Sequence, residues 1–205
     1  MTCPQRPLRR DAARNREQLL AAATQVFADE GLGASVEEIA RVAGVGMGTL
    51  YRRFPTKEDL VIALAEALLA QVVALIELAS TKPDGDGLEF FLREVATLQA
   101  GNRGCLPRLW SSGTNPELVA LARQRIAALL VEAQLHRKVR PEITGTDVTV
   151  ILWSLRGVIE SAEDRALTVW ERHLEIIIAG LRPSPEPLES PALLRSELDA
   201  LLFPS

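Results

Sequence analysis

Apolar residues recur every three or four positions along almost the whole chain, and this spacing restricts the possible fold more than any other feature of the sequence. Within residues 11–30, one stripe of a helix would carry Leu19, Leu20, Ala23, Val26 and Phe27. No alternating run of Val, Ile or Thr bounded by turn residues occurs in the sequence. The sequence therefore predicts an all-α fold.

Capping residues and glycines divide this pattern into about nine helices. Ser35 with Glu38 and Thr56 with Asp59 have the spacing of a capping box, and Gly44 ends a short helix because glycine tolerates left-handed backbone. The expected helices span about residues 11–30, 36–43, 47–54, 57–79, 88–100, 106–111, 116–137, 147–162 and 165–181. Prolines then break the pattern, and the tail that follows predicts one amphipathic turn at about 193–202.

Charge is divided unevenly along the chain. The formal net charge is −4, but residues 1–57 carry 9 Lys and Arg against 6 Asp and Glu, whereas the remainder carries 14 against 21. Only the N-terminal segment therefore has the sign of charge that attracts phosphates.

Composition disfavours several classes of protein. Hydrophobic residues make up 47% and charged residues 24%, which is ordinary for a globular protein. Cys3 and Cys105 cannot form a disulfide framework and suit a reducing cytoplasm. His136 and His173 lie far apart without a cysteine cluster, so neither a metal site nor a cofactor is expected. No catalytic triad or carboxylate pair at an interpretable spacing favours an enzyme.

The longest apolar stretches do not predict a membrane protein. Glu66, Gln71 and Glu77 interrupt the apolar run that begins at Val61, and the basic N-terminus is not followed by the apolar core of a signal peptide. We therefore expect no membrane partner and a cytoplasmic location.

Three physical requirements of a helix-turn-helix meet between residues 35 and 54. Two helices that cross closely need a small residue at their contact, which Ala40 supplies, and a sharp turn needs a positive φ, which Gly44 supplies. Leu50 and Phe54, four positions apart, give the second helix a buried side. The residues left for outward or flanking roles are Met47, Gly48, Thr49, Tyr51, Arg52 and Arg53.

A resemblance to the TetR family of bacterial transcriptional regulators rests on two segments, SVEEIA at 35–40 and GVGMGTLYRRFPTKEDL at 44–60. It implies a homodimer that binds a palindromic operator in double-stranded DNA and releases it when a small-molecule effector occupies the larger domain. The implied parts are a DNA-binding domain over 1–56, a sensor and dimerisation domain over 57–182, and a Pro-rich tail over 183–205.

The resemblance also implies roles for individual residues at the DNA. Ser35 and Lys57 would hold phosphates at helix N-termini, Tyr51 would give its hydroxyl to a phosphate, and Thr49 would reach a base edge or a thymine methyl group. Gly46 and Gly48 would let the helix backbone approach closely, and Met47 is a further candidate without a specified contact. Arg52 and Arg53 are candidates for phosphates, and Arg6, Arg9 and Arg10 for a flexible basic arm. A local ion pair is the alternative for one of Arg52 and Arg53, and a solvated tail is the alternative for the arm.

In the larger domain, the resemblance implies that the last two long helices form a four-helix bundle with a second copy. The candidate interface residues are Ile151, Leu152, Leu155, Ile159, Trp170, Leu174 and Ile177. The alternative is that these stripes face the core of the protomer.

An effector pocket is expected among the fourth to eighth helices, with apolar lining and a few polar groups. The candidates are Phe91, Arg103, Cys105, Trp110, Trp153 and Arg156, each of which could instead be a core or surface residue. A DNA-binding protein without an effector and a transcriptional activator remain alternatives to a ligand-released repressor, whereas a small helical enzyme is disfavoured.

Overall fold

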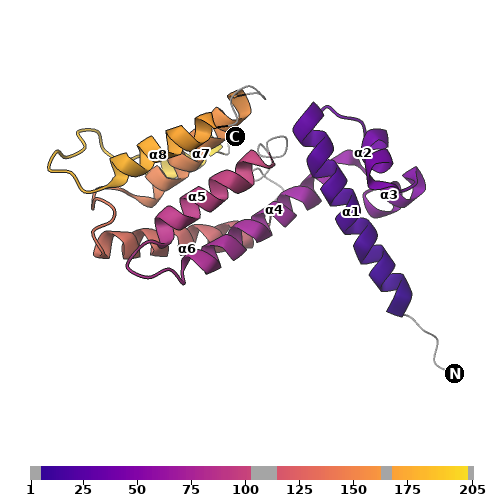
Figure 1. Cartoon of the computed structure of the whole chain (residues 1–205), viewed down its shortest axis with the longest axis horizontal. Coiled ribbons are helices and arrows are strands. Elements are labelled where there is room, and N and C mark those ends of the chain that lie inside the picture. Colours follow the sequence, from indigo (N-terminus) through magenta and orange to yellow (C-terminus); the bar gives the residue numbers. More distant parts are fainter. Residues whose placement is uncertain (1–5, 103–114, 163–167, 203–205) are drawn as a thin grey trace.

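The computed structural model describes residues 6–102, 115–162 and 168–202, and all regular structure within these ranges is helical (Figure 1). The helices are α1 (Arg6–Glu30), α2 (Val36–Ala43), α3 (Met47–Arg53), α4 (Lys57–Ala79), α5 (Gly87–Ala100), α6 (Pro116–Leu135), α7 (Gly145–Ser161), α8 (Val169–Leu181) and α9 (Arg195–Leu202). The predicted all-α fold is confirmed. The helix expected at 106–111 lies outside the described residues.

The first helix is longer than the sequence indicated. It begins at Arg6, so Arg6, Arg9 and Arg10 lie within its first turns, and the prediction of a flexible arm is wrong for these residues. Arg, Leu and Ala favour helix, and Pro7 lies in the first turn, where proline is tolerated because its missing N–H has no partner within the helix. In Figure 1 this end of α1 extends beyond α2 and α3.

Side-chain caps set the starts of α2 and α4. The Ser35 hydroxyl accepts a hydrogen bond from the Glu38 N–H at 3.1 Å, but the reciprocal bond of a capping box is not made. The Glu38 carboxylate accepts from Arg41 Nε at 2.8 Å instead, which corrects that expectation. The capping box of Thr56 and Asp59 is complete, with bonds of 2.9 and 3.1 Å.

A small apolar core holds α1, α2, α3 and the start of α4 together as a head. Its most deeply buried side chains, each at most 1% exposed, are Leu19, Phe27, Ile39, Leu50 and Leu60. Because each helix contributes at least one of them, the orientation of the short α3 is fixed by packing as well as by its own hydrogen bonds.

The long helix α4 runs unbroken from the head into the larger domain (Figure 1). It contacts α1 near its start and α5 and α6 further along. By length and composition α4 could cross a membrane, yet half of its most apolar stretch is buried within this protein. Its apolar character is accounted for by packing in both parts of the molecule.

In the larger domain α5 lies at the centre, in contact with α4, α6, α7 and α8. Phe91, Leu92, Val95 and Ala96 on this helix are completely buried. The remaining helices pack around it and bring their termini together at the end of the domain farthest from the head (Figure 1).

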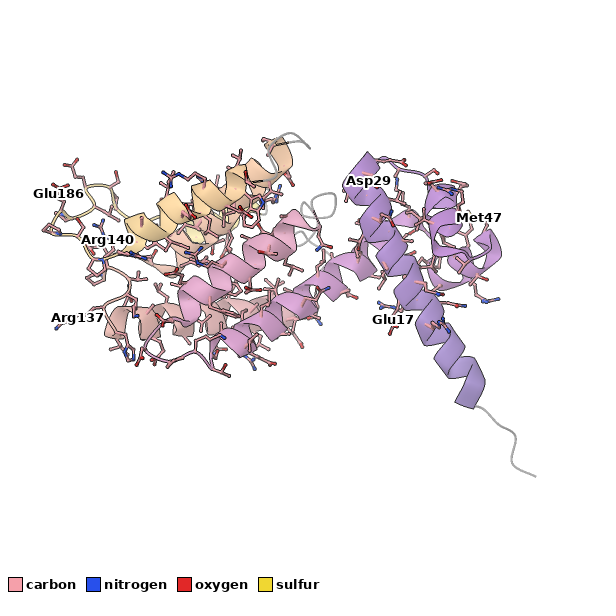
Figure 2. All side chains as sticks on the ribbon, viewed as in Figure 1. Glu17, Asp29, Met47, Arg137, Arg140 and Glu186 are labelled. Carbon is pink, nitrogen blue, oxygen red and sulfur yellow. The ribbon has the colours of Figure 1, made fainter. Side chains whose placement is uncertain are left out.

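The chain after α8 is docked on the larger domain. The buried Arg140 side chain donates a hydrogen bond to the Glu186 carbonyl at 3.2 Å (Figure 2), and the Thr146 hydroxyl donates to the Leu193 carbonyl at 2.8 Å. The helix α9 follows, and its Leu198 side chain is completely buried. This part of the chain is therefore an ordered addition to the domain, with a helix where the sequence indicated only a turn.

Candidate nucleic-acid interface

A tight turn joins α2 to α3. Gly44 lies at its centre with φ +67°, in the left-handed region that disfavours residues with a Cβ. The Val45 N–H donates to the Ala40 carbonyl at 3.1 Å, and Ala40 is only 3% exposed. This geometry agrees with the predictions that Gly44 forms the turn and that Ala40 is the small residue where the two helices meet.

The helix α3 has one buried and one open side. Leu50 and Phe54 are 1% and 4% exposed and anchor the helix in the head, as predicted. Tyr51 is 45% exposed, and the side chains of Arg52 and Arg53 are exposed beside it. Thr49 and Met47 are half-buried at the edge between the two sides. The open side can therefore approach another molecule without loss of the core.

Gly46 and Gly48 have no role in the packing of the protomer. A Cβ at either position would meet no atom within 4 Å, and neither has a positive φ, unlike Gly44. Glycine within a helix lowers its stability by roughly 0.5 to 1 kcal/mol relative to alanine. The fold therefore gives no reason for Gly48 in a seven-residue helix, whereas close approach of a partner to the backbone does.

The ammonium group of Lys57 is already engaged within the head. It donates a hydrogen bond to the Ala34 carbonyl at 2.6 Å and lies 5.8 Å from the centre of the Phe27 ring. This contact joins the start of α4 to the residue before the Ser35 cap. Sequence reasoning missed this role because the two residues are 23 positions apart, and it leaves two of the three ammonium N–H groups for a phosphate.

Ser35 is exposed at the start of α2, next to a surface ion pair. Because its oxygen accepts from the Glu38 N–H, its own hydroxyl proton is free to point toward an acceptor such as a phosphate. The Arg41 side chain, hydrogen-bonded to the Glu38 carboxylate, lowers the pKa of that carboxyl from its ordinary value. Arg41 in turn offsets the negative charge of Glu38 on the exposed surface of α2.

The alternative that Arg52 or Arg53 pairs with a local carboxylate finds no support. Within the described ranges, neither guanidinium forms an ion pair or a side-chain hydrogen bond. Both positive charges lie in the last turn of α3, where they suit the helix dipole and remain available to an anion.

The head and the larger domain both match known regulators. Residues 19–64 match the family described as bacterial regulatory proteins of the tetR family, and residues 83–183 match the C-terminal domain of SbtR-like transcriptional regulators. A TetR transcription regulatory protein from Mycobacterium vanbaalenii is 34% identical with a TM-score of 0.63, and the match covers 86% of this chain and 100% of that one. This chain belongs to the TetR family. A TetR regulator from Streptomyces coelicolor is 33% identical over 82% of this chain and 99% of its own, with a TM-score of 0.59.

Two other proteins are similar over less of the chain or at lower sequence identity. An HTH-type transcriptional regulator of Staphylococcus aureus is 44% identical over 54 residues, which is 26% of this chain and 29% of that protein. A gamma-butyrolactone receptor shares the fold, with a TM-score of 0.62 at 24% identity over 84% of this chain and 90% of its own.

The residues expected at a TetR-type dimer interface divide into two groups. Ile151, Trp170 and Ile177 are half-buried on the surface of α7 and α8. The other four candidates are buried within their own protomer and have little surface left for a partner. They therefore belong to the core of the protomer, as the alternative interpretation expected: Leu152, Leu155, Ile159 and Leu174. Exposed apolar residues that the sequence stripes did not single out as interface candidates lie on the same two helices, namely Val150, Val169 and Ile176.

Of the six residues expected to line a TetR-type effector pocket, three lie in the described part of the chain. Phe91 is completely buried in the core of α5, Trp153 is half-buried, and Arg156 pairs with Glu160 at 3.1 Å. The other three candidates, Arg103, Cys105 and Trp110, lie outside the described residues. Their role in effector binding stays a prediction.

Proposed function

We propose that this chain is a homodimeric repressor of the cytoplasm that binds a palindromic operator through α3 of each protomer and releases it when a small molecule binds. The observation that carries the proposal is the open side of α3, where Gly48, Tyr51 and Arg52 take no part in the core. A short helix with one anchored side and an uncompensated positive charge suits the major groove and its phosphates.

A second copy of the chain would cover the outer surface of α7 and α8. Val150, Val169 and Ile176 are 41%, 47% and 57% exposed there, beside the half-buried Trp170. Pairing of these helices about a twofold axis would bury this apolar surface. The same symmetry would place the two α3 helices about 34 Å apart, as successive major grooves require.

The effector part of the proposal is supported by a buried polar group on α5. Gln99 is 3% exposed, and its side-chain carbonyl receives no hydrogen bond from the described residues. A buried acceptor without a partner costs about 1 to 3 kcal/mol, and a ligand that donates a hydrogen bond would remove this cost. Because α5 contacts α4, a change at this position can reach the helix that enters the head.

DNA binding is tested by fluorescence anisotropy with the promoter region upstream of the protein's own gene. Arg52→Gln and Arg53→Gln should each weaken binding to all sequences and reduce the slope of log affinity against log salt by about 0.9 for each lost phosphate contact. Thr49→Ala should change base preference. Arg93→Gln, an exposed change on α5, is the control. Unchanged affinity in all three head variants would contradict the assignment of α3.

Dimerisation is tested by light scattering of the intact protein. Ile176→Glu should yield monomers, because a carboxylate would be buried at the α8 pairing surface. Val131→Glu on α6, where the side chain is similarly exposed at 53%, should remain dimeric.

Release is tested by operator titrations against a broad metabolite panel, and identical operator affinity with every compound would remove support for an effector.

A further inference from the structure

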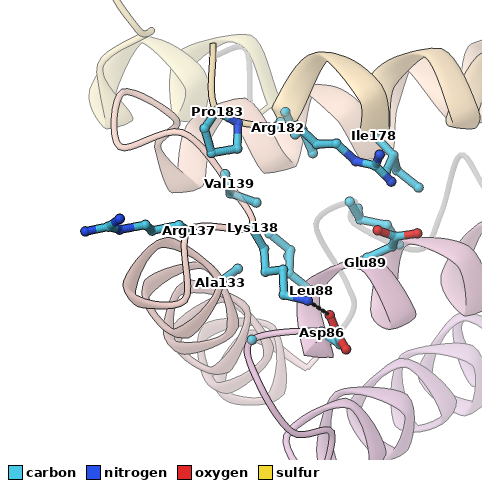
Figure 3. A pocket seen from close by; sticks show the side chains of 13 residues that line it. Asp86, Leu88, Glu89, Ala133, Arg137, Lys138, Val139, Ile178, Arg182 and Pro183 are labelled. Atoms are coloured by element: carbon cyan, nitrogen blue, oxygen red, sulfur yellow. Dashed lines mark ion pairs between the residues drawn. The ribbon is translucent and has the colours of Figure 1, made fainter. Parts of the chain in front are cut away.

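A cavity of about 260 Å³ lies at the end of the larger domain, away from the head (Figure 3). It is formed where the start of α5 meets the ends of α6 and α8. Its floor is apolar and consists of the buried side chains Leu88, Leu92, Val139, Ile178 and Leu181. It contains none of the residues considered above for DNA or effector binding.

The charges at the mouth of this distal cavity are unevenly compensated. The Asp86 carboxylate pairs with Lys138 at 2.7 Å (Figure 3). The Glu89 carboxylate pairs with Arg93 at 2.8 Å. Arg182 also lines the cavity, but its guanidinium forms no ion pair or hydrogen bond in the described part of the chain. Arg137 also lines the cavity without an ion pair or side-chain hydrogen bond in the described part of the chain, but its side chain points away from the cavity (Figure 3). The mouth therefore offers one unpaired positive charge above an apolar floor.

The turns around the mouth are held in fixed and partly strained conformations. Among the described residues, only Asp84 and Arg137 have a positive φ without being glycine, and both belong to these turns. A Cβ on Gly87 would come within 2.6 Å of the Ala79 carbonyl, so the start of α5 is packed closely on the end of α4. Non-glycine residues in left-handed backbone cost energy and are concentrated at binding sites and switch regions.

We propose that this cavity binds a small amphipathic carboxylate, with its apolar part on Leu92 and Ile178 and its carboxylate on Arg182. One guanidinium matches a single carboxylate and can bind it through two parallel N–H donors. A cation is disfavoured because both carboxylates at the mouth already have partners. The volume is just below the range typical of drug-sized ligands, so a short chain is expected.

This binding is measured on the full-length protein without DNA, so its result does not depend on the proposed regulation. Isothermal titration with butanoate, hexanoate and octanoate should give one saturable site per protomer. Affinity should rise by about fourfold for each added methylene group until the cavity is full, because each buried methylene contributes about 0.8 kcal/mol. Hexan-1-ol and hexylamine should bind at least about tenfold more weakly than hexanoate, since neither can pair with a guanidinium.

Two further measurements place the ligand in this cavity. Arg182→Gln should weaken hexanoate binding by about tenfold or more without lowering the thermal midpoint, because the side chain is exposed and unpaired, whereas Arg125→Gln on α6 should bind normally. In isoleucine-methyl spectra, hexanoate should shift the Ile178 signal and leave Ile126 unchanged. Equal binding of hexanoate and hexan-1-ol, normal binding by Arg182→Gln, or shifts confined to other isoleucines would overturn the proposal.

Discussion

Lys57 joins three parts of the DNA-binding head through one ammonium group. Its contacts with the Ala34 carbonyl and the Phe27 ring connect the start of α4, the end of α1 and the residue before the Ser35 cap of α2. Charge-assisted hydrogen bonds of this length are stronger than neutral ones, and this one is partly shielded from water. Lys57 therefore positions the Ser35 end of α2 whether or not it also contacts a phosphate.

Replacing Lys57 by Met should lower the free energy of unfolding by about 1 kcal/mol, because the apolar stem is kept while the donor is lost. Urea unfolding measures the change. Arg53→Met, which removes an exposed charge without an ion pair among the described residues, should leave stability unchanged. Equal stability of both variants would show that the bond to Ala34 contributes nothing.

The Glu38–Arg41 pair gives a prediction about pH. The pKa of Glu38 lies below its ordinary value of 4.5, mainly because Arg41 hydrogen-bonds to its charged form. Any stabilisation from the pair is therefore present above about pH 4.5 and is lost as the pH falls through the lowered pKa. In a carbon-detected titration, Arg41→Gln should move the Glu38 midpoint upward, and an unmoved midpoint would exclude this cause.

At the scale of elements, the α2-turn-α3 unit contains glycines of two kinds. Gly44 is required by backbone conformation, whereas Gly48 is not required by the protomer at all. Within five residues, one glycine is therefore explained by folding and the other by the approach of a partner.

The two glycines should therefore respond oppositely to alanine. Gly44→Ala should destabilise the protein by about 1 kcal/mol, because a Cβ is strained at positive φ. Gly48→Ala should stabilise it by about 0.5 kcal/mol and yet weaken operator binding by about tenfold, because the new methyl group faces the DNA. Thermal unfolding and anisotropy measure the two effects. A Gly48→Ala protein with normal DNA affinity would contradict the orientation of α3.

The sequence predicts the end of a helix where the residues that determine it are close together in the chain. The Thr56–Asp59 capping box, the left-handed Gly44 and the buried Leu50 each depend on residues at most four positions away. The same rule failed at Ser35, because Glu38 has a competing partner in Arg41 that the capping pattern does not consider.

What the sequence could not predict depends on contacts between distant segments. The Lys57 bond to Ala34 and the Arg140 bond to Glu186 join residues 23 and 46 positions apart, and neither belongs to a recognisable spacing. The apolar stripe of α7 was visible, but burial by the protomer could not be separated from burial by a partner. The distal cavity is likewise not predictable from local patterns, because the ends of three helices contribute to it.

At the scale of the whole molecule, the docked tail lies outside the parts that match the family, which end at residue 183. It covers Arg140 and Thr146, two of the few polar residues that are buried in the described chain. These side chains would lose their partners in Glu186 and Leu193 if the tail were absent.

A chain that ends at residue 183 should therefore be less stable. Loss of the buried Leu198 removes about 2 kcal/mol, and two hydrogen bonds are lost with it. With about 1 kcal/mol for each hydrogen bond, the total loss is about 4 kcal/mol. The thermal midpoint should fall by about 8 to 16 °C, since each kcal/mol corresponds to roughly 2 to 4 °C in a protein of this size. Leu194→Ala, a change at an exposed position of the same tail, is the control. An unchanged midpoint would mean that the tail is not bound in solution.

Because α4 is one unbroken helix, a small movement at one of its ends is carried to the other end. A helix of 23 residues is about 34 Å long. If it pivots as a rigid rod at its end in the larger domain, a tilt of about 5° displaces the opposite end by about 3 Å, roughly the separation of adjacent base pairs along DNA. A shift smaller than one side chain in the larger domain would then be enough to put α3 out of register with its groove.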